Sequence, residues 1–377
     1  MHVHIVDPSA YTPPYDHALC TALAAAGARV ELYTSRFAYG PAPEPEGYER
    51  RELFYRAARL AHGACGRRLL KLIEHVPDMV AYRRAARAAE VVHFQWLTVQ
   101  HLDGHLLPPR RPAGGERRPL LLTAHDILPR EPLPGQREAQ RRLYDRFDAI
   151  VVHSAHGRAR LIDELGLDPG TVHVIPHGAL PPLSPPSGAI PFPETGRPVV
   201  LFFGLLRPYK GLDLLLEAFR GIADAELWIA GMPRFDISAL RAGAASNVHF
   251  RTSFIGEEEL SSLFARADLI VLPYREIDQS GVAFTALGAG LPMLLSDAGG
   301  FPELARTGAA RTFPAGDAAA LAGALRELLA DPAALAQMGA RAREAARGEY
   351  SWGSIAARTL ELYDSLLSPD VGENPAR

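Results

Sequence analysis

The apolar residues of this chain fall into short continuous runs that alternate with stretches of helical periodicity. The runs do not alternate between apolar and polar positions, as a strand with one solvent-facing side would. A continuous apolar run is typical of a strand that helices cover on both faces, as in a parallel sheet. The runs that we predict as strands are residues 3–7, 28–34, 91–95, 119–125, 148–153, 172–176, 198–204, 226–231, 247–250, 268–273 and 292–297.

Helical periodicity fills most of the intervals between these strands, so the pattern predicts an α/β protein. The segment LPPLSPPSGAIPFPETGRP, residues 180–198, interrupts the rhythm because its Pro and Gly residues cannot continue a regular element. We therefore predict two doubly wound domains, residues 1–182 and 198–349, with a linker at 183–197. The clearest helical patterns are residues 16–26, 211–220, 257–266, 282–289, 317–329, 332–347 and 352–367.

Chain length agrees with this division, because 377 residues are more than one ordinary hydrophobic core carries. In doubly wound sheets, ligands bind at the carboxyl ends of the strands. A ligand shared by two such domains would sit in a cleft between them. The last helix, at about residues 350–368, is expected to pack back on the first domain. The polar tail, residues 369–377, is expected to be disordered.

Composition narrows the class of protein. A hydrophobic content of 47% and a charged content of 22% are typical of a globular protein in water, and a net charge of −3 does not favour nucleic acid. Cys20 and Cys65 are the only cysteines, which excludes a disulfide framework. The first residues lack the pattern of a signal peptide, and no run is long enough to span a membrane. We expect a cytoplasmic location.

Two cations follow the first strand of the second domain, in the stretch FFGLLRPYKGLDLLLEAF, residues 202–219. Gly204 ends the apolar run, and Arg207 and Lys210 precede the next helix. A helix N-terminus and two cations at a strand end suit a phosphate or diphosphate. A solvated Arg and Lys in a loop would give the same spacing.

A second strand-to-helix junction has similar chemistry, in DQSGVAFTALGAGLP, residues 278–292. Ser280 is a natural N-cap residue, and Gly281 would expose backbone N–H groups to an anion. Plain capping is the alternative explanation. Two such junctions in one domain favour a shared diphosphate. The spacing matches neither a P-loop nor the glycine fingerprint of dinucleotide-binding domains.

In combination, these stretches resemble the group 1 (GT4) family of GT-B glycosyltransferases, which are retaining enzymes. The matching pieces occur in the family's order: IPHGA, FFGLLRPYKGLDLLLEAF, WIAG, EEELSSLFARADLIVLPY, GAGLPMLLSDAGGFPEL and PAGDAAALAGALRELL, within residues 175–329. In the first domain HIVD, LTAHD and IVVHS are recognisable. The resemblance implies two Rossmann-like domains facing across a cleft, with the nucleotide-sugar donor bound by the second and the acceptor by the first.

The resemblance also implies roles for individual residues. Arg207 and Lys210 would bind the donor diphosphate and stabilise the charge that grows on it as it leaves. The pair would do the work of a metal ion, so no metal and no cofactor is expected. Gly231 would lie near the base. Glu303 would reach the donor, although an acid in the first turn of a helix has an ordinary structural explanation.

The sequence departs from the family at the Glu-x7-Glu motif. Counting back from Pro292, the two acidic positions fall on Ile277 and Thr285. A shift of one residue would let Asp278 replace the first Glu, and Thr285 can still bond a hydroxyl. These departures leave room for a non-catalytic GT-B protein that binds a nucleotide sugar or a partner. Another GT-B activity, such as a sugar-nucleotide epimerase or a phosphorylase, is a further alternative.

Candidate residues on the acceptor side follow the strands of the first domain. The resemblance assigns His125 to the sugar or the reaction centre, with Asp126 beside it. Tyr15, after the Pro pair of the first loop, is expected to face the cleft unless that loop is only a rigid turn. His93 and Trp96 follow another strand, where Trp96 would stack on a sugar or belong to the core.

The window from residue 50 to residue 90 is the most basic part of the chain. It contains ten Lys or Arg and four Asp or Glu, a net charge of +6, so the rest of the chain carries −9. Within it, Leu69, Leu70, Ile73 and Val76 have nearly helical spacing beside basic residues. Such a helix predicts peripheral contact with an anionic membrane face and a lipid-linked acceptor. An ordinary surface helix is the alternative.

Overall fold

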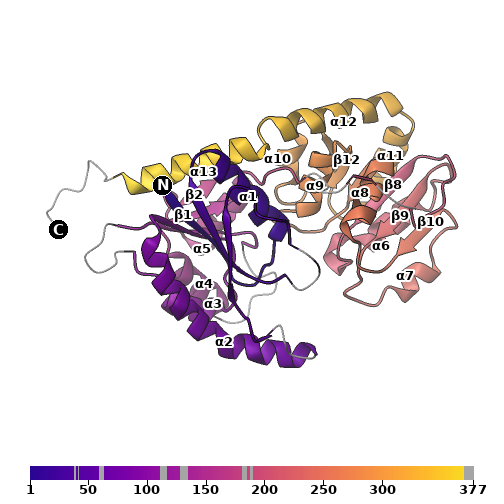
Figure 1. Cartoon of the computed structure of the whole chain (residues 1–377). Coiled ribbons are helices and arrows are strands. Elements are labelled where there is room, and N and C mark those ends of the chain that lie inside the picture. Colours follow the sequence, from indigo (N-terminus) through magenta and orange to yellow (C-terminus); the bar gives the residue numbers. More distant parts are fainter. Residues whose placement is uncertain are drawn as a thin grey trace. The chain divides into compact units, whose positions relative to one another are not determined.

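The computed structural model describes residues 1–37, 40, 42–58, 63–110, 117–127, 135–180, 185–186 and 190–368. The chain forms two compact units (Figure 1). The first unit combines Met1–Pro176 with Trp352–Arg377, and the second is His177–Ser351. None of the described helices combines the length and the apolarity needed to cross a membrane.

In the described part of the first unit, seven parallel strands form one sheet in the order β3-β2-β1-β4-β5-β6-β7. The strands are β1 (His2–Asp7), β2 (Arg29–Ser35), β3 (Glu49–Phe54), β4 (Val91–Phe94), β5 (Leu120–Thr123), β6 (Ala149–Val152) and β7 (Val172–Val174). The helices are α1 (Pro13–Ala25), α2 (Ala64–Ala85), α3 (Gln100–Leu106), α4 (Gln136–Tyr144), α5 (Ala155–Leu165) and α13 (Trp352–Leu367), with a 3₁₀ turn, η2 (Ala86–Ala88).

Each face of this sheet has its own hydrophobic core. Val3 and Ile5 of β1 pack on one side with α1 and α13, whereas Val6 faces the other side with α2, α4 and α5. Burial on both faces explains why the strands are continuous apolar runs. The last helix, α13, therefore completes the core of the first unit although it follows the whole second unit in the sequence.

The described part of the second unit contains a six-stranded parallel sheet in the order β10-β9-β8-β11-β12-β13. Its strands are β8 (Val199–Phe203), β9 (Glu226–Ala230), β10 (Val248–Arg251), β11 (Leu269–Leu272), β12 (Met293–Ser296) and β13 (Ala310–Phe313). Its helices are η3 (Pro208–Lys210), α6 (Leu212–Phe219), α7 (Ser238–Ala242), α8 (Glu257–Arg266), α9 (Gly281–Ala289), α10 (Phe301–Ala305), α11 (Ala318–Leu329) and α12 (Pro332–Arg347).

The predicted fold class is confirmed, with two strands added. Apolar runs do not mark β3, which reads ERRELF, or β13, which reads ARTF. Both lie at the edge of their sheets, where one side of a strand is covered less and charged residues are tolerated. The basic window therefore begins inside a strand.

The boundary between the units lies at Pro176, before the Pro-rich segment that was expected to be a linker. Phe192 is buried and stacks on Trp228, with ring centroids 4.8 Å apart, and the Thr195 hydroxyl donates a 2.9 Å hydrogen bond to Glu226. The described end of the segment thus packs on the second sheet. Residues 183–184 and 187–189, and the expected tail at 369–377, lie outside the described residues.

Candidate active site

The carboxyl edge of the second sheet brings three loops together, because β8 lies between β9 and β11. Gly204 follows β8 and Gly231 follows β9, with φ angles of +117° and +142° that L side chains rarely adopt. A Cβ atom at Gly231 would lie 2.0 Å from the carbonyl oxygen of Gly204. The two loops approach this closely because neither residue has a side chain.

Lys210 ends the short turn η3 and places its charge at this edge. The residue is only 8% exposed, and its Nζ lies 5.0 Å from the centroid of the Tyr274 ring, a cation–π distance. A Cβ atom at Gly204 would lie 2.8 Å from this Nζ and 3.3 Å from a methyl group of Val282. The ammonium group thus lies against Gly204, next to the first turn of α9.

The N-terminus of α9 is open to a ligand. Ser280 occupies the N-cap position, but its buried side chain makes no capping hydrogen bond. Its carbonyl oxygen accepts hydrogen bonds from the amides of Ala283 and Phe284. The amides of Gly281 and Val282 donate hydrogen bonds to no described residue. Two uncommitted N–H groups at a helix N-terminus, beside a lysine ammonium, form a site suited to a phosphate.

Arg207 differs from Lys210 in its surroundings. It is exposed, it precedes η3 with an extended backbone (φ −131°, ψ 151°), and it forms no ion pair with a described residue. Its guanidinium is therefore uncommitted, in a medium of higher dielectric than that around Lys210.

The remaining donor-side candidates lie on neighbouring loops. The Thr285 hydroxyl donates a 3.0 Å hydrogen bond to the carbonyl of Gly281, so its oxygen remains an acceptor for a ligand. Asp278 is half-buried in the loop before α9, and Glu303 is half-buried in the first turn of α10. Gly299, with φ +58°, fixes the two loops together, because a Cβ atom there would lie 1.6 Å from the carbonyl oxygen of Ile277.

In the first unit, aromatic rings gather around His125 at the carboxyl end of β5. The Trp96 ring stacks on His125 with centroids 4.9 Å apart and an interplanar angle of 13°. Tyr15 meets the same imidazole edge-on at 4.8 Å and also contacts Trp352 of α13. Tyr15 is 4% exposed, so it supports His125 from within and exposes little of its own surface. Asp126, the next residue, is exposed.

Hydrogen bonds orient the imidazole of His125. His153 donates from Nδ1 to the carbonyl oxygen of Ile175 at 2.9 Å, and burial lowers the pKa of His153 to about 4. This neutral ring presents Nε2 as an acceptor, so His125 donates from Nδ1 across 3.3 Å. The side-chain oxygen of Gln95 lies 3.3 Å from Nε2 of His125, and because this oxygen only accepts, the contact is a hydrogen bond only when both ring nitrogens carry a proton. No role was predicted for His153 or Gln95, although each is a polar residue after a buried strand.

His93 lies inside the unit. Its Nδ1 is 2.7 Å from the Tyr363 hydroxyl of α13, and its Nε2 is 2.8 Å from the Thr123 hydroxyl of β5. Burial lowers its pKa to about 3, so the ring is neutral. Both ring nitrogens are engaged, and the residue links the sheet to α13. His93 therefore has no free ring nitrogen in this structure with which to fill the acceptor-side role expected from the sequence.

A pair of buried carboxyl groups, Asp7 and Asp16, fixes the loop after β1. Asp7 accepts backbone hydrogen bonds from Ser9, Tyr11 and Thr12 at 3.2, 2.6 and 3.3 Å. Burial raises the pKa of Asp16 well above its usual range, and the hydrogen bond to Asp7 raises it further. The proton kept on Asp16 is available to Asp7, which explains how two acids share this site.

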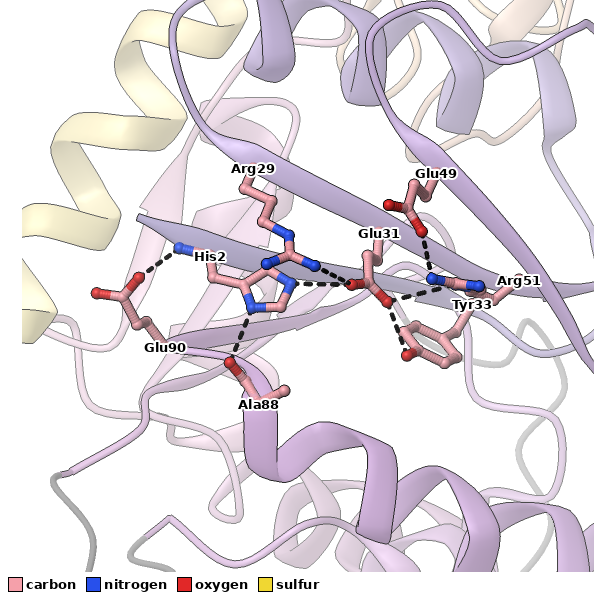
Figure 2. A network of polar contacts seen from close by, with 8 residues as sticks. All are labelled: His2, Arg29, Glu31, Tyr33, Glu49, Arg51, Ala88 and Glu90. Carbon is pink, nitrogen blue, oxygen red and sulfur yellow. Dashed lines mark hydrogen bonds and ion pairs between the residues drawn. The ribbon is translucent and has the colours of Figure 1, made fainter.

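Possible metal ligands gather elsewhere in the first unit. Among the described residues, His2, His4 and Glu31 have ligand atoms within 4.8 Å of one another, a cluster that sequence spacing did not predict. Hydrogen bonds and ion pairs from His2, Arg29, Tyr33 and other neighbours already surround Glu31 (Figure 2). The cluster lies at the start of β1 and β2, the opposite end from the loops described above.

Each of the two units matches the model of a known protein family. The model described as Glycosyltransferase Family 4 matches residues 15–179, and the model described as Glycosyl transferases group 1 matches residues 197–331. A GDP-mannose-dependent alpha-(1-6)-phosphatidylinositol monomannoside mannosyltransferase of Mycolicibacterium smegmatis is 30% identical over 278 residues, which are 68% of this chain and 72% of that protein.

Solved structures agree on the fold. Sucrose-phosphate synthase from Thermosynechococcus elongatus superimposes with a TM-score of 0.72 at 21% identity, covering 97% of this chain and 99% of that one. Anabaena HepE in complex with UDP-glucose superimposes with a TM-score of 0.68 at 17% identity, covering 97% and 100%. With the family matches and the mannosyltransferase relative, the two Rossmann-like units identify this chain as a GT-B glycosyltransferase of the group 1 and GT4 family, which uses nucleotide-sugar donors.

Proposed function

We propose that the enzyme is a retaining hexosyltransferase that transfers a sugar from a nucleotide diphosphate to an acceptor hydroxyl without a metal ion. The position of Lys210 carries the proposal. Its Nζ lies against Gly204 beside the uncommitted amides of Gly281 and Val282, a set of groups that matches a diphosphate in charge and geometry.

In the proposed reaction the bond between the anomeric carbon and the diphosphate oxygen breaks, and the electron pair stays on the leaving group. The new negative charge falls on the β-phosphate, where Lys210, Arg207 and the amides of α9 would stabilise it. The acceptor oxygen forms its bond on the face that the diphosphate leaves. Its proton moves to a leaving-group oxygen.

The half-buried groups Asp278, Glu303 and Thr285 are proposed to bind hydroxyls of the donor, in place of the missing Glu pair. His125 is proposed to contact the reacting sugar, because its ring is held on three sides and one nitrogen is fixed as a donor. Because the ring is already fixed, it loses little further conformational entropy when a substrate binds.

Two measurements test the proposal. A thermal-shift panel of UDP-, GDP- and dTDP-sugars should give a rise in melting temperature with one nucleotide, and Lys210→Met should abolish most of that rise. Proton NMR of the product formed from an α-linked donor should show an α linkage. A β-linked product would exclude retention, and loss of activity on metal chelation would exclude the metal-independent mechanism.

A non-catalytic protein that binds a nucleotide sugar is a second candidate, because Ile277 and Thr285 occupy the two positions where the family has Glu. The two candidates differ in turnover. An enzyme releases nucleoside diphosphate from its donor slowly even without acceptor, whereas a binding protein shows saturable affinity and releases none.

We further propose that the enzyme contacts a membrane through the outward face of α2, and that its acceptor is lipid-linked. Leu69, Leu72, Ile73 and Val76 are 60%, 56%, 61% and 41% exposed. Their spacing places them on one face of the helix, which the unit leaves uncovered, beside Arg68. Co-flotation with anionic liposomes should occur and should be lost in Leu69→Ser/Ile73→Ser. A protein that remains in the soluble fraction would contradict this proposal.

A further inference from the structure

A large basic cavity lies in the first unit, at the carboxyl ends of β2 and β3 and against α2. Its volume is about 1090 Å³. One carboxylate, that of Glu52, lines it, together with six cationic side chains: Arg36, Arg50, Arg51, Arg56, Arg67 and Lys71. An excess of positive charge in a concave site concentrates anions.

The cations nearest to α2 form no ion pair with a described residue. The guanidinium groups of Arg36 and Arg67 form no hydrogen bond or ion pair with a described residue. Lys71 lies with its Nζ 5.0 Å from the centroid of the Tyr55 ring, and burial lowers its pKa. By contrast, Arg50 donates to the carbonyl of Pro43 at 2.6 Å. Three cations thus remain for a ligand.

The wall that carries Lys71 is rigid and strained. Tyr55 is buried with φ +55°, a value that costs free energy for any residue with a side chain. Its amide donates to Asp78 at 2.8 Å, and its hydroxyl lies 2.8 Å from Nδ1 of the buried His75. Nε2 of His75 lies 2.6 Å from the buried carboxylate of Asp103. This chain of buried groups holds the tyrosine in place, as a preorganised binding site requires.

The cavity is also continuous with the loop that supports His125. Ser9 lines the cavity, and its hydroxyl bonds that of Thr98 at 2.9 Å. Two residues later, the ring of Tyr11 packs on Trp96 with centroids 5.0 Å apart, and Trp96 stacks on His125. The cavity therefore shares the loop after β1 with the aromatic residues that support His125.

We propose that this cavity binds the phosphate group of a phosphorylated acceptor, with Arg36, Arg67 and Lys71 as its ligands. The proposal rests on the proposed glycosyl transfer and names the class of acceptor. Guanidinium groups bind phosphate oxygens in pairs, and three cations without an ion pair to a described residue match a dianion better than a neutral sugar. The phosphate belongs either to a soluble ester or to a lipid headgroup.

Isothermal titration calorimetry with glycerol 3-phosphate, in the presence of saturating nucleoside diphosphate, tests the soluble source without interference from the donor site. Flotation with phosphatidylcholine vesicles, with and without phosphatidic acid, tests the lipid source. Arg67→Ala/Lys71→Met should weaken the phosphate-dependent binding at least tenfold. Arg87→Ala, an exposed residue of η2 that belongs neither to the cavity lining nor to the apolar face of α2, should leave it unchanged. Arg67→Lys should retain part of the affinity.

Dependence on Arg67 and Lys71 in either assay supports the site and identifies the source of the phosphate. Absence of binding in both assays, or an equal loss in Arg87→Ala, overturns the proposal. The thermal shift with nucleotide sugar is measured on the same variants and should persist. If the unmodified protein shows a nucleotide shift but binds no phosphate, only the acceptor class is rejected. If the unmodified protein shows no nucleotide shift, the proposed transfer itself is rejected.

Discussion

Lys210 and Arg207 are both proposed to bind the donor diphosphate, yet their surroundings predict unequal contributions to the rate. Lys210 is 8% exposed and rests on the Tyr274 ring, whereas Arg207 is exposed. Lys210→Met removes the charge and keeps an unbranched stem in the same space. Lys210→Arg keeps the charge, and Arg207→Ala removes the exposed charge.

Coulomb's law gives the size of the difference. Two unit charges about 4 Å apart interact by about 4 kcal/mol at an effective dielectric constant of about 20, and by about 1 kcal/mol in water. Since about 1.4 kcal/mol is tenfold in rate, we expect Lys210→Met to lower the rate of the chemical step by about 10²–10³. Arg207→Ala should lower it about tenfold or less, and added salt should reduce this smaller effect.

Single-turnover release of nucleoside diphosphate measures the chemical step, and calorimetry measures the donor Kd separately. We expect Lys210→Met to lower the rate more than the donor affinity, because the charge on the leaving group exists fully only in the transition state. An Arg207→Ala defect as large as that of Lys210→Met would refute the argument from burial. A loss of donor affinity with an unchanged rate would refute the role in catalysis.

Three further predictions concern stability. Gly231→Ala should lower the melting temperature and abolish the nucleotide-induced shift, because its Cβ would lie 2.0 Å from a backbone oxygen; Gly323→Ala, where a Cβ meets nothing within 4 Å, should leave both intact or raise the melting temperature. The free energy of unfolding should fall as pH drops from about 6.5 toward 4, because burial lowers the pKa of His93 to about 3 and of His153 to about 4, so the unfolded chain binds protons first. Urea midpoints at pH 7 and 5 measure this, and a midpoint that rises on acidification would contradict it. Tyr363→Phe should cost about 1–3 kcal/mol in urea unfolding by leaving Nδ1 of His93 unpaired, and an unchanged midpoint would contradict that estimate.

The sequence alone determined the two-domain α/β fold and the position of the donor-side candidates. Continuous apolar runs mark strands that are buried on both faces, and parallel strands place their carboxyl ends at one edge. Such runs are followed closely by Gly204, Lys210 and Gly281. Chain order therefore predicts that these three residues come together at one edge of the sheet. This information is local, which is why a single sequence contains it.

Only the tertiary structure decided which polar side chains are internal. His93 and His125 both follow buried strands, yet α13, more than 200 residues later, covers His93 and leaves His125 half-buried. The basic cavity likewise depends on β2, the edge strand β3 and the helix α2, because Arg36 follows β2 whereas Arg67 and Lys71 lie on α2. Burial and charge compensation depend on contacts between distant segments, and residue type or spacing along the chain does not specify those contacts.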